Sequence, residues 1–147
     1  GHRPRGHAAR CEVAARVSSL IVDTNAYGAF LAGHAQAVAA LSSASEVHIP
    51  LIVLAELLAG FAVGSRPEKN RARLEHFMAS RRASLMLPDE RTAHQYAQVY
   101  LALRSRGRPV PTNDLWIAAL ARQHRMPLLT FDAHFAAVPG LELVLRP

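Results

Sequence analysis

The chain has 147 residues, half of them hydrophobic, and a formal net charge of +6. This length suits one domain whose core is stable without disulfides or a structural metal, and the composition excludes a wholly disordered chain. The longest apolar stretch, residues 49–63, contains Glu56 and is too short to span a bilayer. We therefore expect no membrane contact. Cys11 has no second cysteine to pair with, so we expect a cytoplasmic protein.

Residues 1–17 form a basic segment at the N-terminus. The first sixteen contain four Arg and one Glu and lack the long apolar core of a secretory signal. One interpretation is an arm that binds nucleic acid, and the one we favour is an upstream extension or cloning remnant. We therefore expect a disordered extension over residues 1–17 and one folded domain over residues 18–147.

Short apolar runs then alternate with helical patterns. The runs cover residues 20–22, 47–49, 85–87, 128–130 and 141–145. The helical patterns cover residues 26–33, 34–43, 50–63, 68–80, 89–104 and, after a loop at 107–111, about 112–124. Pro50 suits a first helical position, and Thr112 or Asn113 is expected to cap the last helix. The alternation predicts a three-layer α/β/α sandwich with a mostly parallel sheet of four to five strands.

The chain has only four Asp residues, and three of them lie beside hydrophobic segments where a charge is costly. Asp23 directly follows the predicted strand "SLIV", and Asp132 directly follows "LLTF". Because the carboxyl ends of parallel strands meet at one edge of a sheet, we expect these two acids to share a crevice. Asp89 has the ordinary role of opening a helix.

Two further acids fit more than one interpretation. Asp114 lies in the first turn of an apolar helix, where it either complements the helix dipole or points into the same crevice. Glu56 lies in "PLIVLAELLAGFAV" without a polar stripe, so a structural ion pair with an arginine and a site carboxylate both account for it. Taken together, the four acids form a cluster of like charges that divalent cations would neutralise.

The ligand types favour a hard cation, Mg²⁺ or Mn²⁺, over zinc. No pair of cysteines exists and the histidines lack a zinc spacing, so His134 and His124 are interpreted as a loop and a surface histidine. Carboxylates that bind a pair of such ions are typical of phosphodiester hydrolysis.

Arginine supplies sixteen of the seventeen cationic residues, which suits contact with phosphates. We expect some of Arg104, Arg106 and Arg108, which bracket the loop before Asp114, to guide a nucleic acid to the acids, together with Arg81 and Arg82. A solvated charged surface is the alternative for each of these arginines.

Three segments, "LIVDTNAYGAF", "IPLIVLAELLAG" and "PTNDLWIAALARQHRMPLLTFDAHF", together resemble the PIN-domain ribonucleases, and more narrowly the VapC-type toxins of type II toxin–antitoxin pairs. The resemblance covers the chain from about Ser18 onward. It implies a PIN-like domain with an acidic pocket for Mg²⁺ or Mn²⁺, in which Asp23, Glu56, Asp114 and Asp132 are the catalytic and metal-binding residues. The polar residues expected to orient these acids are Thr24, Asn25, Thr112, Asn113 and Thr130.

The implied activity is endoribonuclease cleavage of RNA by a metal-activated water, with Glu56 or Asp114 accepting the proton of that water. The resemblance also implies a small antitoxin partner whose C-terminal segment covers the pocket, a homodimer, and a heterotetramer or larger assembly with the antitoxin. Apolar faces at residues 27–31 and 54–61 are candidate contact surfaces, and an ordinary core role is the alternative for them.

One departure from the family pattern concerns the last motif. Many relatives carry a second acid two residues after the fourth, where this chain has His134. A catalytically silent PIN-like module that binds RNA or protein is therefore the alternative function. A phosphatase of the haloacid-dehalogenase type is disfavoured, because that reaction needs an acid at the position of Asn25.

Overall fold

The computed structural model describes residues 18–144. The basic segment 1–17, with Cys11, and the last residue of the apolar run 141–145 lie outside the described residues. Within the part described, no helix has the length and apolar character needed to cross a membrane.

The centre of the fold is a four-stranded parallel sheet in the order β3-β2-β1-β4. Its strands are β1 (Ser19–Val22), β2 (Glu46–Pro50), β3 (Ala83–Met86) and β4 (Leu128–Leu129). Residues Leu20 to Val22 of β1 are almost fully buried, as expected for the central strand of a sheet covered on both faces. The carboxyl ends of all four strands meet at one edge, because every pairing is parallel.

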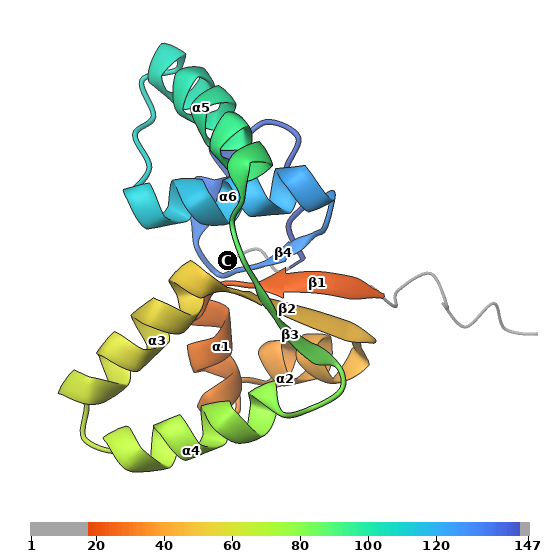
Figure 1. The fold of residues 1–147 in the computed structure, drawn as a ribbon, viewed down its shortest axis with the longest axis vertical. Helices are drawn as coiled ribbons and strands as arrows, with labels where there is room; N and C mark the ends of the chain where they lie inside the picture. The colour runs from red at the N-terminus through yellow and green to blue at the C-terminus, as the bar shows by residue number, and fades with distance from the viewer. Residues whose placement is uncertain (1–17, 145–147) are drawn as a thin grey trace, which may run out of the picture.

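Helices cover both faces of the sheet (Figure 1). One layer holds α1 (Thr24–Leu31), α2 (Ala35–Ser43), α3 (Leu51–Val63) and α4 (Pro67–Met78). The other holds α5 (Glu90–Ser105) and α6 (Thr112–His124), which pack on each other, with the short 3-10 helix η2 (Ala133–Ala137) beyond β4. The three-layer α/β/α sandwich predicted from the sequence is confirmed.

Helix α6 is the most deeply buried helix, as its apolar sequence predicts. Its side chains from Ile117 to Leu120 are inaccessible to solvent. Burial of an Ile or Leu side chain stabilises the fold by about 1.5–3 kcal/mol, so this packing fixes the helix firmly. The N-terminus of α6, which bears Asp114, is thereby held beside the carboxyl edge of the sheet.

Several predicted boundaries are wrong in detail. Strand β3 begins and ends earlier than predicted, because Pro50↔Met86 is the last pair in its register with β2, and Leu87 is 59% exposed. The run at 141–145 contributes only an isolated bridge, Leu128↔Leu143, among the described residues. Pro50 closes β2 and caps α3 from outside the helix.

The cap of α6 also differs from the prediction. Pro111 is the N-cap, and both Thr112 and Asn113 lie inside the first turn. Pro111 has an extended backbone and its carbonyl accepts the first helical bond from the Leu115 N–H, at 3.0 Å. The helix therefore begins one turn before Leu115 without a side-chain cap.

Candidate active site

Asp23 lies where β1 ends and α1 begins. Its Oδ1 accepts from the Thr24 backbone N–H at 2.8 Å, which makes it the N-cap of α1, and its Oδ2 accepts from the Thr130 hydroxyl at 2.7 Å. The side chain is only 4% exposed. Burial, with a smaller contribution from the charges of Asp114 and Glu56, raises the pKa of Asp23 from 3.8 to about 6 despite these two hydrogen bonds.

Asn25 and Thr130 join the carboxyl ends of β1 and β4. Asn25 Oδ1 accepts from the Phe131 N–H at 3.1 Å, and Thr130 Oγ1 accepts from the Asp132 N–H at 3.0 Å. Thr130 is fully buried, so its hydroxyl is held in place by the core. These contacts fix the position of Asp23 relative to the segment that bears Asp132.

Glu56 reaches the same region from α3. Its Oε1 accepts from the Thr24 hydroxyl at 3.1 Å, and its side chain is partly buried. Within residues 18–144 it forms no ion pair with an arginine or lysine. The structural ion pair considered for Glu56 is therefore not seen in this part of the chain.

The third and fourth acids approach from the other side and meet His134. Asp114 lies in the first turn of α6, and Asp132 is the N-cap of η2. His134 Nε2 lies 2.5 Å from Asp114 Oδ2, and its Nδ1 lies 2.7 Å from Asp132 Oδ1. The contact between Nε2 and Asp114 is a hydrogen bond, and both carboxylates lie within ion-pair distance of the ring.

His134 corrects the prediction from sequence. It was expected to be a loop histidine, and it lies between two of the four acids. The Asp-x-His spacing in "FDAHF" was the available signal, because the tight 3-10 turn of η2 brings His134 back to Asp132.

All four acids line one open cleft of about 630 Å³ at the carboxyl edge of the sheet. Its lining residues are Asp23, Thr24, Asn25, Glu56, Pro111, Thr112, Asn113, Asp114, Asp132 and His134. Thr112 and Asn113 thus contribute to the wall of the cleft beside Asp114.

The donor set of this cleft fits a divalent cation. Asp114, Asp132 and His134 each offer one ligand atom, and these three atoms lie within 4.8 Å of one another. Carboxylates suit Mg²⁺ and Mn²⁺, whereas an imidazole suits Mn²⁺ and other transition metals better than Mg²⁺. A cation in the cleft would also offset the repulsion that contributes to the raised pKa of Asp23.

The arginines named from the sequence separate into two groups. Arg106 and Arg108 border a cavity next to the acidic cleft, and Arg104 lies one turn earlier on α5. Arg82 lies at the amino end of the sheet, where its Nη1 donates to the carbonyls of Leu41 at 2.8 Å and Ala44 at 2.5 Å. The structure therefore does not bring Arg81 and Arg82 to the acids.

Comparisons with known proteins agree with this architecture. The family profile of the PIN domain matches residues 20–141. The ribonuclease VapC4 of Mycobacterium tuberculosis is 33% identical over 96 residues, which are 65% of this chain and 74% of that protein.

Two solved structures show the same fold. DNA-bound VapBC from Salmonella typhimurium matches with a TM-score of 0.76 and 25% identity, over 86% of this chain and 96% of that one. VapBC-5 of Mycobacterium tuberculosis, from the VapBC family of toxin–antitoxin systems, matches with a TM-score of 0.64 and 28% identity, over 88% of this chain and 97% of that one.

Proposed function

This chain belongs to the PIN-domain family, VapC type, and from that premise we propose that it is a metal-dependent endoribonuclease, the toxin of a toxin–antitoxin pair. The observation that supports this most is the convergence of Asp23, Glu56, Asp114 and Asp132 on one open cleft. A protein with a net charge of +6 around an acidic cleft is suited to attract a polyanion that the acids would otherwise repel.

In this proposal Asp23, Asp114 and Asp132 hold Mg²⁺ or Mn²⁺, with His134 as an additional ligand. The bound cation supplies the positive charge that stabilises the phosphate and activates the attacking water. Thr130 and Thr24 hold the Asp23 carboxylate by donating to its two oxygens, which fixes its orientation before substrate binds.

We assign the role of proton acceptor to Glu56. One oxygen of Asp114 contacts the His134 ring, whereas within residues 18–144 Glu56 accepts only from a neutral hydroxyl, that of Thr24. Glu56 is therefore better placed to take the proton of the water that attacks the phosphate.

RNA cleavage with added metal tests the proposal. The wild-type protein should cut RNA in Mn²⁺ and stop in EDTA, and Asp23→Asn and Asp114→Asn should each be inactive. Asp89→Asn is the matched control, because Asp89 caps α5 outside the cleft and Asn is an equally good N-cap. RNA that is bound and left intact would instead favour the silent binding module, for which the contacts of His134 with Asp114 and Asp132 are the supporting observation.

The antitoxin partner has a candidate docking groove between α1 and α4. The groove has a volume of about 600 Å³ and an aromatic floor formed by Tyr27, Phe30 and Phe77. Lys69 and Arg73 lie at its rim. An apolar floor with a cationic rim fits an amphipathic segment bearing acidic side chains, and the similar VapBC-5 is a member of a family of toxin–antitoxin systems.

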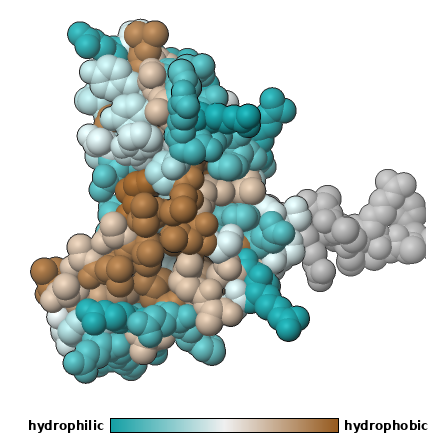
Figure 2. Space-filling model, viewed as in Figure 1, coloured by the Kyte–Doolittle hydropathy of each residue, from teal (hydrophilic) through white to brown (hydrophobic). Residues whose placement is uncertain are grey.

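A second copy of the chain has a separate candidate surface. Hydrophobic side chains gather over α3 and β3 on the face seen in Figure 2. They include Leu51, Leu58, Leu85 and Leu87, which are 38–59% exposed, and β3 is an edge strand of the sheet. We propose that this face forms the homodimer and, with antitoxin bound, the core of a heterotetramer or larger assembly. Leu58→Glu should yield a monomer in light scattering, and an unchanged dimer would reject this surface.

A further inference from the structure

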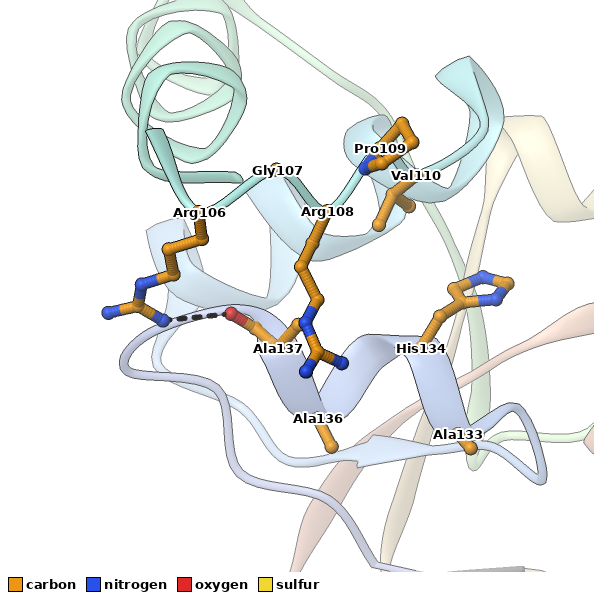
Figure 3. A pocket seen from close by; sticks show the side chains of 9 residues that line it. All are labelled: Arg106, Gly107, Arg108, Pro109, Val110, Ala133, His134, Ala136 and Ala137. Atoms are coloured by element: carbon orange, nitrogen blue, oxygen red, sulfur yellow. Dashed lines mark hydrogen bonds between the residues drawn. The ribbon is translucent and has the colours of Figure 1, made fainter. Parts of the chain in front are cut away.

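A second cavity, of about 590 Å³, adjoins the acidic cleft and shares His134 with it. One wall is the loop between α5 and α6, and the other is η2 (Figure 3). The lining includes Arg106, Arg108, Pro109, Val110 and Ala136, and the described part of the chain contributes no carboxylate to it. The molecule therefore places a basic, partly apolar cavity directly beside its acidic cleft.

The two arginines of this cavity have different environments. Arg106 Nη1 donates to the Ala137 carbonyl at 3.1 Å, which joins the end of α5 to η2 (Figure 3). Gly107 follows with φ +64, a left-handed conformation that favours glycine, and the turn lets the Arg108 N–H donate to the Leu103 carbonyl at 2.9 Å. The Arg108 side chain then extends into the cavity, and within residues 18–144 its guanidinium has no hydrogen-bonded or ionic partner.

The chemistry of this cavity matches a nucleotide. An unpaired guanidinium is suited to bind a phosphate through two parallel N–H donors, and Pro109 and Val110 offer an apolar surface to a base or ribose. A base enters such a recess only when it is unstacked and unpaired, which is the state of single-stranded RNA. A duplex would keep its bases out of the cavity.

We propose that this cavity binds an unpaired nucleotide next to the scissile phosphate, with Arg108 on its phosphate. The proposal rests on the nuclease function proposed above. Arg106 is assigned a positioning role, because its contact with Ala137 holds the loop that presents Arg108. Arg104 is a less direct contributor, since it does not line this cavity.

Equilibrium RNA binding tests the proposal. Fluorescence anisotropy would use a short unstructured RNA, and the same RNA annealed to its complement, with the full chain carrying Glu56→Gln in Mg²⁺ so that cleavage is slow. Adding Arg108→Gln should weaken single-strand binding about three- to tenfold and lower the slope of log K against log salt by about 0.7, the value for one phosphate contact. Arg108→Lys should recover part of the affinity and all of the salt slope, because it keeps the charge.

Arg91→Gln is the matched control, because Arg91 is exposed on α5 and does not line either cavity. Arg91→Gln should leave the binding affinity for both RNAs unchanged. The proposal would be overturned if Arg108→Gln kept the wild-type RNA affinity and salt slope, or if it lost as much affinity for the duplex as for the single strand. The nuclease function would still stand in that case, provided that the wild-type protein cleaved RNA in Mn²⁺. Wild-type protein that fails to cleave any RNA in Mn²⁺ would reject the nuclease function itself.

Discussion

The two halves of the acidic cleft hold their carboxylates in different ways. Asp23 and Glu56, on the β1 and α3 side, accept hydrogen bonds from threonine hydroxyls and the backbone. Asp114 and Asp132, on the α6 and η2 side, share the ring of His134. Neutral donors orient a carboxylate and leave its charge for a cation, whereas an imidazole can add a ligand atom to the site. The first half is therefore built for hard cations, and the second for a cation that accepts nitrogen.

The largest expected effect concerns Glu56 in the first half. If it accepts the proton of the attacking water, Glu56→Gln should lower the cleavage rate about 10²- to 10⁴-fold, while Mn²⁺ affinity changes much less. Glu75→Gln, on the exposed face of α4, should cleave like wild type. Single-turnover cleavage together with Mn²⁺ titration measures both quantities, and a normal rate in Glu56→Gln would transfer the role to another group.

The buried position of Asp23 predicts a pH-dependent stability. Its pKa is about 6 in the folded chain against an ordinary 3.8, so the folded state holds this proton more tightly than the unfolded state. The resulting stabilisation is complete below pH 3.8 and is lost as the pH rises through about 6. In EDTA, Asp23→Asn should therefore be more stable than wild type by about 3 kcal/mol above pH 7, with the difference shrinking towards pH 4.

Urea denaturation of both proteins at several pH values checks this expectation. Asp89→Asn should show no such gain above pH 7, because Asp89 lies outside the cleft and its pKa is lowered. Adding Mn²⁺ should stabilise wild type and leave Asp23→Asn nearly unchanged. A variant that is no more stable than wild type at pH 7.5 would mean that the Asp23 carboxylate is not destabilised by its burial.

A substitution of Thr130 tests whether its hydrogen bond to Asp23 orients that carboxylate. Thr130→Val keeps the shape of this buried side chain but leaves Asp23 Oδ2 without its hydroxyl donor. Loss of such an orienting contact should lower cleavage or Mn²⁺ affinity about 10- to 100-fold. Thr112→Val, on the wall of the cleft and without this bond, is the comparison, and equal losses in both variants would argue against an orienting role for Thr130.

His134 gives the smallest expected effect and tests the second half directly. His134→Ala should weaken Mn²⁺ binding several-fold and Mg²⁺ binding less, because imidazole prefers transition metals. His94→Ala, at an exposed position on α5, should change neither. Tighter Mn²⁺ binding in His134→Ala would show that the ring competes with the ion for Asp114 and Asp132.

The sequence predicted the acids that follow strands better than it predicted the position of His134. A parallel sheet places the residues after each strand at one edge, so the shared crevice of Asp23 and Asp132 followed from the strand ends. The position of His134 depends on the tight turn of η2, which hydrophobic periodicity does not encode. Arg82 shows the same limit, because its bonds to Leu41 and Ala44 join segments that lie far apart in the sequence.

Mn²⁺ binding to the metal-free protein, followed by calorimetry, tests most directly whether the aspartates of the cleft form a metal site. We predict saturable binding to wild type, at least tenfold weaker binding to Asp23→Asn and Asp114→Asn, and wild-type affinity in Asp89→Asn. Equal Mn²⁺ affinity in all four proteins, or no saturable binding to wild type, would contradict the proposed role of the cleft.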